Sequence, residues 1–228
     1  MLEQIRAQID WPQAFPPEEY AARRAQVRKV LQAKGLDAIY VNLPADLLWL
    51  TGYDMIWYHY RCLTGLLVRA DRDETVLFDS GGHKTLVYMT PEIREVVWFD
   101  PNPVASAGQG ELVATELAKR GLGRGRIAIQ PWGYSPHATV MDAFAERLRQ
   151  GGATVGDGSR LVEELRLVKS PREIAVVRQA AKFADEAMAA ARDAIAPGVM
   201  ETAIEGAAIA SLMRNRSEER RVGKECRL

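Results

Sequence analysis

A group of aromatic and basic side chains lies at residues 57–62, where the sequence is WYHYRC. Three aromatic rings, His59 and Arg61 occur here between a turn and a predicted strand. A guanidinium group binds carboxylate or carbonyl oxygens through paired hydrogen bonds, and aromatic faces enclose small organic molecules. The segment is therefore a candidate recognition loop for a small anionic or carbonyl-bearing substrate. The same residues are also typical of a strand that packs one aromatic face inward, and both interpretations stay open.

The other residues that could take part in catalysis are spread along the chain. His59, His83 and His137 share neither a helix face nor a cysteine–histidine cluster, so their spacing does not predict a metal site. The segment DSGGHK (residues 79–84) lacks the glycine spacing of a phosphate-binding loop and is expected to be a tight strand-to-helix turn. Six acidic residues have neighbouring basic residues at spacings typical of solvated helix faces: Glu163, Glu164, Glu173, Asp185, Glu186 and Asp193. These patterns assign no catalytic residue and no metal ligand.

The composition is that of an ordinary globular protein. Of the 228 residues, 47% are hydrophobic, and the formal net charge is zero, which does not suggest a nucleic-acid partner. The two cysteines, Cys62 and Cys226, are too few for a disulfide framework. The N-terminus has charges where a secretory signal would be apolar, and no run approaches the roughly 18 apolar residues of a membrane span. We therefore expect a cytoplasmic protein with neither a nucleic-acid nor a membrane partner.

Helical and strand patterns alternate along the first 158 residues. We expect helices at 16–35, 110–121 and 135–152, a short helix or turn at 45–52, and a further helical segment near 84–89. Strands are expected at 38–42, 64–69, 75–79, 95–99 and 126–130, the second and third forming a hairpin around a charged turn. This alternation predicts an α/β domain with a mixed sheet and flanking helices.

After residues 153–159 the pattern changes to almost continuous helix. Ser170, Pro171 and Glu173 have the spacing of a capping box with proline at the first helical position, and the helix is expected to end at Pro197 and Gly198. We place a domain boundary between residues 158 and 170. The predicted organisation is an N-terminal extension (1–16), an α/β domain (17–158), a linker with the start of a second domain (159–214) and a tail (215–228).

The sequence around this boundary resembles the creatinase, prolidase and aminopeptidase P family. The match to the junction before that family's metallohydrolase domain comprises Leu165, Arg166, Lys169, Ser170, Glu173, Ile174 and Arg178. Residues 42–53 (NLPADLLWLTGY) are similar to the family's amino-terminal domain, so the resemblance covers about residues 17–214. It implies a ribonuclease-H-like α/β domain, followed by the first helices of a truncated pita-bread α+β domain.

The resemblance also implies a function for a longer parent protein. Peptidase members cleave Xaa-Pro bonds, as dipeptidases or aminopeptidases, with two divalent metal ions (Mn, Co or Zn) that activate a bridging water. Those ligands would lie downstream, so neither a catalytic residue nor a metal ligand is assigned in this chain. One alternative is a creatinase-type C–N hydrolase that acts without metal on a guanidino compound or compatible solute. Another is a pita-bread module that binds without catalysis.

The resemblance further implies a homodimer, in which the amino-terminal domain of one subunit borders the active site of the other. Creatinase-like relatives place an aromatic residue and an arginine into that site shortly after a pair that corresponds here to Thr51 and Gly52. Tyr58, His59 and Arg61 are therefore the predicted substrate-binding residues. They would contact, in trans, a small peptide or another small molecule.

The last residues raise a separate question. Residues 216–227 (RSEERRVGKECR) match, residue by residue, the translation of a common short-read sequencing adapter. We therefore expect the tail not to be protein sequence, and the chain to be an amino-terminal fragment without hydrolytic activity of its own. Residues 201–214 would then lack the sheet they should cover. We expect that segment to be mobile, and slow hydrogen exchange throughout it would contradict this expectation.

Overall fold

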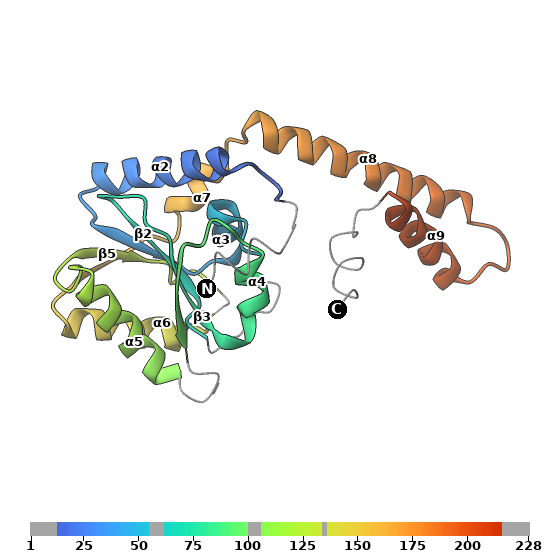
Figure 1. Cartoon of the computed structure of the whole chain (residues 1–228). Coiled ribbons are helices and arrows are strands. Elements are labelled where there is room, and N and C mark those ends of the chain that lie inside the picture. Colours follow the sequence, from blue (N-terminus) through green and yellow to red (C-terminus); the bar gives the residue numbers. More distant parts are fainter. Residues whose placement is uncertain (1–12, 55–61, 100–105, 134–135, 216–228) are drawn as a thin grey trace. The chain divides into compact units, whose positions relative to one another are not determined.

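A six-stranded mixed sheet forms the centre of the first part of the chain (Figure 1). The structure is a computed structural model that describes residues 13–54, 62–99, 106–133 and 136–215. The strand order is β4-β3-β2-β1-β5-β6. The strands are β1 (Ala38–Val41), β2 (Gly65–Arg69), β3 (Val76–Ser80), β4 (Glu95–Phe99), β5 (Arg126–Ile129) and β6 (Thr154–Asp157). The predicted α/β class with a mixed sheet is confirmed.

Helices cover both faces of this sheet (Figure 1). One apolar core lies between the sheet and four helices: α2 (Pro17–Ala33), α3 (Pro44–Thr51), α4 (Lys84–Tyr88) and α7 (Leu161–Arg166). The second core lies on the other face, under α5 (Ser106–Lys119) and α6 (Ala138–Gln150). Side chains alternate between the two cores along each strand, so that Ile39 enters the first core and Tyr40 the second.

Tyr40 determines the packing of the second core. Its ring centroid lies 5.1 Å from that of Phe144 and 5.7 Å from that of Phe78. Its hydroxyl donates a hydrogen bond to the carbonyl oxygen of Leu63 at 2.5 Å. On the neighbouring strand stands Gly65, where a Cβ atom would lie 2.4 Å from the Tyr40 ring. Glycine therefore leaves the space that this buried aromatic ring occupies.

Strand β6 differs from the expectation for residues 153–159, where the sequence pattern predicts no strand. The strand has only four residues: the first and last are exposed, and the two between them are half-buried. Neither alternation nor a continuous apolar run therefore marks it in the sequence. Its position comes from parallel pairing with β5, from Arg126↔Thr154 to Ile129↔Asp157.

Two helix starts depend on specific hydrogen bonds. The backbone N–H of Glu173 donates to the Ser170 hydroxyl at 3.2 Å, and the N–H of Ser170 donates to the Glu173 carboxylate at 2.7 Å. The predicted capping box at the start of α8 (Pro171–Asp193) is thus confirmed. In α6 the Nδ1 atom of His137 accepts from the N–H of Thr139, so that this helix begins at Ala138.

A buried arginine fastens α2 to the rest of its layer. The Nε of Arg24 donates to Asp73 at 2.8 Å, and its Nη1 donates to Glu92 at 2.7 Å and to the carbonyl oxygen of Leu50 at 3.2 Å. The Arg24 side chain is 1% exposed. Arg28 reaches the same Asp73 carboxylate at 3.0 Å from a more exposed position. One guanidinium group thus joins α2 to three other segments of the chain.

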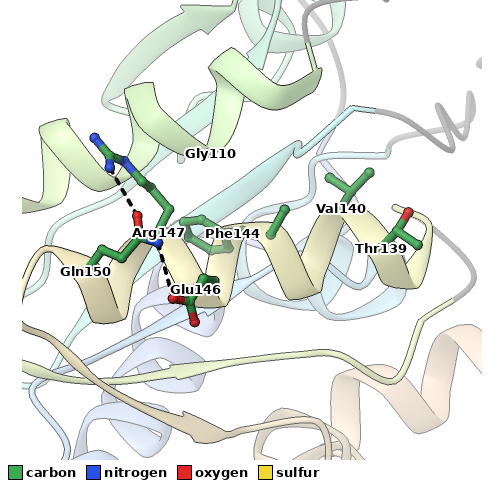
Figure 2. Close-up of a pocket in the computed structure, with 8 residues that line it drawn as sticks. Gly110, Thr139, Val140, Phe144, Glu146, Arg147 and Gln150 are labelled. Carbon is green, nitrogen blue, oxygen red and sulfur yellow. Dashed lines mark hydrogen bonds between the residues drawn. The ribbon is translucent and has the colours of Figure 1, made fainter.

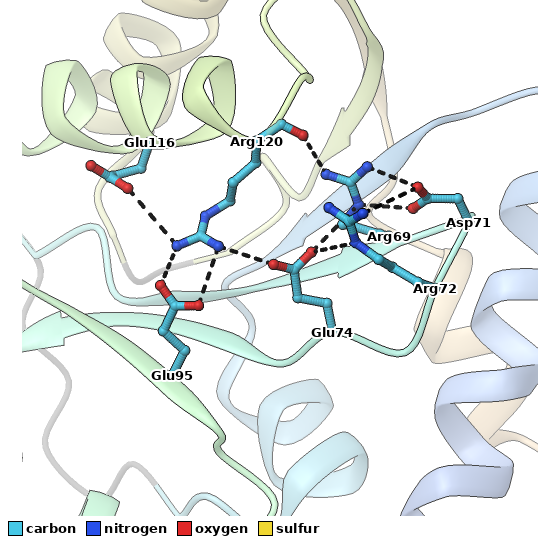
Figure 3. A network of polar contacts seen from close by, with 7 residues as sticks. All are labelled: Arg69, Asp71, Arg72, Glu74, Glu95, Glu116 and Arg120. Atoms are coloured by element: carbon cyan, nitrogen blue, oxygen red, sulfur yellow. Dashed lines mark hydrogen bonds and ion pairs between the residues drawn. The ribbon is translucent and has the colours of Figure 1, made fainter. Parts of the chain in front are cut away.

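A second ion-pair network lies where β2 ends and β3 and β4 begin (Figure 3). Arg120, after the end of α5, donates to Glu74 at 2.9 Å and also pairs with Glu95. Arg69 donates to Asp71 at 2.8 Å and to the carbonyl oxygen of Arg120 at 2.7 Å. The hydrogen bond from Arg69 lowers the pKa of Asp71. This network holds together the turns at the end of the sheet where β2 ends and β3 and β4 begin.

The chain divides into two compact units, residues 1–168 and 169–228. The short helix α7 contacts α2 and α3 and so is part of the first unit. In the second unit α8 packs against α9 (Glu201–Arg214), with Ala187 and Ser211 buried. Among the described helices, none combines the length and the apolar character that crossing a lipid bilayer requires.

Candidate functional site

The edge of the sheet opposite the ion-pair network gathers the ends of five strands. Because β2 alone runs antiparallel to the others, β1, β3, β4, β5 and β6 all end at the edge where β2 begins. We call this edge the carboxyl edge. Ligands of α/β sheets usually bind outside the carboxyl ends of strands. Polar side chains at this edge are therefore the first candidates for function.

Asp79, near the end of β3, is the centre of a buried polar cluster at this edge. Its carboxylate is fully buried and accepts hydrogen bonds on both oxygens. The Oδ1 atom accepts from the Thr64 hydroxyl at 2.9 Å, from the N–H of Ser80 at 2.7 Å and from Nδ1 of His83 at 2.8 Å. The Oδ2 atom accepts from the hydroxyl of Tyr53. We call Tyr53, Cys62, Thr64, Asp79 and His83 the Asp79 cluster.

The environment keeps the donors of the Asp79 cluster protonated. Burial raises the pKa of the Tyr53 hydroxyl, and the charge of Asp79 and its hydrogen bond raise it further. Burial likewise raises the pKa of the Cys62 thiol, although hydrogen bonding between Cys62 and Thr64 opposes the shift. The hydrogen bond to Asp79 raises the pKa of His83, against the opposite effect of burial.

These shifts determine what the cluster can do chemically. A nucleophilic cysteine needs a lowered pKa, so the raised pKa of Cys62 argues against a thiolate nucleophile. Oδ1 of Asp79 accepts from the Thr64 hydroxyl and the Ser80 N–H, and as an acceptor it places the proton of the shared bond on Nδ1 of His83. The cluster therefore orients side chains and holds their protons in place.

A second buried polar group lies at the ends of β1 and β5. Gln130 accepts from the N–H groups of Asn42 and Leu43 at 3.0 and 3.1 Å, and donates to Asp46 at 2.6 Å. Arg166 of α7 donates to the other oxygen of Asp46 at 2.7 Å. Burial raises the pKa of Asp46, and the hydrogen bonds from Gln130 and Arg166 oppose the shift. This group ties α3 and α7 to the sheet.

The predicted substrate-binding residues Tyr58, His59 and Arg61 lie outside the described residues. Of the other histidines, His83 is buried beside Asp79, and His137 is exposed at the start of α6. The segment at residues 79–84 is the predicted strand-to-helix turn: β3 ends at Ser80, a 3₁₀ turn spans Gly81–His83, and α4 follows. The sequence analysis missed the role of Asp79, although it noted the turn that this residue begins.

Three of the six acidic residues, Glu164, Glu186 and Asp193, pair with exposed basic residues as predicted, whereas the carboxylate of Glu173 closes the capping box of α8. The distances between carboxylate oxygen and side-chain nitrogen are 3.4 Å for Glu164 and Arg160, 3.9 Å for Glu186 and Lys182, and 2.9 Å for Asp193 and Arg192. Exposed pairs of this kind contribute roughly 0–1 kcal/mol each and suggest no catalytic role.

A groove lies between α5 and α6, with a volume of about 390 Å³ (Figure 2). Its floor includes Gly110 and the buried Phe144, and its rim includes Thr139, Glu146 and Gln150. Arg147 lines the groove and pairs with Glu111 across the two helices. The groove lies on the outer face of the helix layer and contains no member of the Asp79 cluster.

The described residues do not fit a metal centre. Nowhere in the described ranges do three or more His, Cys, Asp or Glu side chains converge so that they could hold a metal ion. In the Asp79 cluster, hydrogen-bond donors already occupy both carboxylate oxygens.

The pair formed by His83 and Asp79 predicts a pH dependence of stability. The folded-state pKa of His83 is raised above its usual value of about 6.5. The stabilisation from the charged pair is therefore complete below about pH 6.5 and is lost as the pH rises through the folded-state pKa. We expect the destabilisation caused by His83→Gln, measured by urea unfolding, to be larger at pH 6 than at pH 9. A pH-independent effect of His83→Gln would contradict the prediction.

Comparison with known proteins identifies the first unit. Residues 23–168 match the family model described as the creatinase/prolidase N-terminal domain. The ectoine hydrolase of Halomonas elongata is 28% identical over 194 residues, which cover 81% of this chain and 46% of that protein. An uncharacterised hydrolase/peptidase of Sinorhizobium fredii is also 28% identical, over 82% of this chain and 48% of that protein. The chain thus spans about half the length of the curated relatives it matches.

Solved structures share the fold. The dipeptidase PepE from Mycobacterium ulcerans aligns with a TM-score of 0.66 at 18% identity, over 88% of this chain and 51% of that one. The prolidase from Pyrococcus horikoshii aligns with a TM-score of 0.62 at 14% identity, over 85% and 49%. At these identities the likeness shows the fold alone.

Proposed function

The chain belongs to the creatinase/prolidase N-terminal domain family, and from this membership we propose that it is the amino-terminal part of a hydrolase that cleaves a carbon–nitrogen bond in a small substrate. The observation that supports the proposal most is the family match, which covers residues 23–168 and so includes all six strands of the sheet. The Asp79 cluster agrees with a supporting role, because it orients side chains and offers no nucleophile.

The first candidate activity is hydrolysis of Xaa-Pro peptides. It is supported by the family junction at residues 164–188 and by the hydrolase/peptidase among the relatives. In this candidate, a pair of divalent metal ions, when bound, would provide the attacking water and polarise the scissile carbonyl group. Their ligands would lie outside the residues described above, and α8 and α9 would be the first helices of the metal-binding domain.

The second candidate is hydrolysis of a compatible solute. The relative from Halomonas elongata is named for ectoine, and its similarity extends over four-fifths of this chain. In both candidates we propose that the complete protein is a cytoplasmic homodimer. The amino-terminal domain of one subunit would then border the active site of the other. Tyr58, His59 and Arg61 would contact the substrate there, with the arginine binding a carboxylate or carbonyl group.

An assay of the complete gene product tests the proposal. The purified protein is incubated with Ala-Pro and Gly-Pro dipeptides and with ectoine, before and after dialysis against EDTA. For the peptidase candidate we expect dipeptide release that falls by about 100-fold or more on chelation and returns with Mn²⁺, Co²⁺ or Zn²⁺, since bound metals supply several kcal/mol of transition-state stabilisation.

The controls separate the remaining outcomes. Turnover of ectoine alone would select the second candidate. The 228-residue chain is assayed in parallel and is expected to be inactive. Turnover by this chain would contradict the proposal that the catalytic residues lie outside it. If the complete protein hydrolyses none of these substrates with any of the three metals, the hydrolase proposal fails and a binding role replaces it.

A further inference from the structure

Strand β4 has a neighbouring strand on one side only. It is the last strand of the sheet order, and among the described strands it pairs with β3 alone. The N–H of Glu95 donates a hydrogen bond toward β3, to the carbonyl oxygen of Thr75 at 3.2 Å. Because successive residues of a strand direct their backbone groups to opposite sides, those of Val96 and Trp98 face away from β3. We call this side the outer side of β4.

The sequence of β4 offers little protection against pairing on this outer side. Exposed sheet edges are usually blunted by lysine, proline, a bulge or an inward-pointing charge. Strand β4 reads EVVWF, so its only charged residue is Glu95 at the first position, which pairs with Arg120. Val96, Val97 and Trp98 are half-buried and so keep part of their apolar surface accessible. Open backbone groups on an apolar strand are a template for one more strand.

The strand at the opposite side of the sheet, β6, is less suited to such pairing. The N–H of Thr154 donates to the carbonyl oxygen of Gly125, beside the start of β5, so the backbone groups of Val155 and Asp157 face away from β5. The outward residues thus include a charged one, and Gly156 between them weakens the strand. Of these two outermost strands, β4 is the one that favours a further strand.

We infer that β4 is a self-association surface: it pairs in antiparallel orientation with β4 of a second copy of the chain, centred on Val97. The two six-stranded sheets then join into one sheet around a two-fold axis. In this register Val96 and Trp98 of the partner subunit exchange two backbone hydrogen bonds, and the symmetric pair exchanges two more. These four bonds satisfy the backbone groups on the outer side of both strands.

The side chains of β4 are complementary to their own copies in this register. Val96 packs against the first core and meets Trp98 of the partner subunit on the same face, and β-branched and aromatic residues form a stabilising cross-strand pair. On the other face Val97 meets its own counterpart, so the centre of the contact is apolar. Glu95 lies opposite Phe99 of the partner subunit, which keeps like charges apart. This self-complementarity favours a second copy over an unrelated strand.

The contact is small. Each copy contributes one strand of five residues, whereas stable interfaces use about 20–30 residues a side. We therefore expect a weak dimer of the 228-residue chain, which further contacts would strengthen in the complete protein. The inference goes beyond the proposed function, because it concerns a surface of the described sheet and requires no hydrolytic activity. Failure of the hydrolase proposal leaves it unaffected.

Sedimentation velocity of the 228-residue chain over a range of concentrations tests the inference. We expect a reversible equilibrium between monomer and dimer. Val96→Pro removes one outward N–H from each copy and keeps the bonds to β3, because proline is tolerated in an edge strand where the N–H would face away from the sheet. The dimer loses two of its four backbone bonds, so the dissociation constant is expected to rise by at least about tenfold. A chain that is monomeric at every concentration, or a Val96→Pro variant that dimerises like the wild type, would overturn the inference.

Val155→Pro is the matched control for Val96→Pro. Val155 is an outward residue of β6, half-buried like Val96 and with its N–H facing away from the neighbouring strand. Its replacement makes the same chemical change at the other side of the sheet and is expected to leave the dissociation constant unchanged. Circular dichroism checks that both variants keep the fold. Equal weakening by the two substitutions would contradict a specific role of β4.

A disulfide test examines the register without using proline. It is made in a Cys226→Ser background, in which the buried Cys62 is the only other thiol. Val97→Cys places the two new thiols opposite each other at the two-fold axis, where the Cα atoms of a non-hydrogen-bonded pair lie about 4.5 Å apart, a separation that a disulfide can span. With oxidised glutathione as the oxidant, we expect a covalent dimer on electrophoresis without reductant.

Val96→Cys in the same background is the control for register. Its two new thiols would stand two residues apart along the strands, with roughly 9 Å between Cα atoms, which exceeds the separation of about 7 Å that a disulfide tolerates. We therefore expect a covalent dimer from Val97→Cys and not from Val96→Cys. Equal yields from the two variants, or no covalent dimer from Val97→Cys, would contradict the inferred pairing.

Discussion

Replacement of Arg24 by alanine is expected to lower the free energy of unfolding by about 3–5 kcal/mol, because removing one partner of a buried ion pair leaves the other charge without compensation. Glu92 is 10% exposed and receives its short hydrogen bond from Arg24. Asp73 also loses a partner: burial raises its pKa, yet the hydrogen bond and charge of Arg24 hold the pKa below its usual value. Urea unfolding followed by circular dichroism measures the change.

Arg28 provides the matched control for Arg24. It lies one helical turn further along α2 and pairs with the same Asp73 carboxylate, but its side chain is 22% exposed. Arg28→Ala is expected to cost about 0–1 kcal/mol, as is usual for pairs near the surface. If the two substitutions lowered the free energy of unfolding equally, burial would not be the reason for the expected large contribution of Arg24 to stability.

Substitution of Gly65 by alanine is expected to destabilise the sheet by about 1–3 kcal/mol, the usual cost of overpacking a core. The new methyl group would lie 2.4 Å from the Tyr40 ring. That ring cannot move away easily, because Phe78 and Phe144 pack against it and its hydroxyl is bonded to Leu63. The shift of the urea midpoint at constant m-value measures the effect.

Gly156 in β6 is the control for Gly65. It is also a strand glycine, but a Cβ atom there would meet no heavy atom within 4 Å. Gly156→Ala is therefore expected to be neutral or slightly stabilising, since alanine loses less conformational freedom than glycine on folding. A double variant with Tyr40→Leu should recover part of the stability lost in Gly65→Ala. Failure of this recovery would argue against the proposed clash.

The sequence predicted most of the fold, because most elements have local signals. The hairpin of β2 and β3 was predicted from two β-rich runs around a charged turn, and the structure pairs Gly65 with Phe78. The capping box placed the start of α8 at Pro171. By contrast, β6 has no signal of its own, since its four residues are fixed by pairing with β5. Helix α5 begins at Ser106, before the predicted residue 110.

The Asp79 cluster could not be predicted in the same way. Its members come from positions 53, 62, 64, 79 and 83, and no two of them form a known motif. What joins them is that β2 lies beside β3 with antiparallel register, so that Thr64 reaches the end of the neighbouring strand. Because Asp79 is buried, its carboxylate is satisfied by protein groups alone, and four donors fill this role. Both conditions arise from tertiary structure, which single-sequence patterns do not contain.

The strand order also has a consequence for how the protein forms during synthesis. The central strand β1 pairs in parallel with β5, and 85 positions separate Val41 from Arg126. A ribosome adds roughly 5–20 residues per second, so β1 waits roughly 4–17 s for this partner. The hairpin partner β2 emerges much earlier, which leaves the apolar strand AIYV with one uncovered edge during that interval. A chaperone that protects nascent chains would be needed most during this interval, and slowing translation between β2 and β5 should increase aggregation.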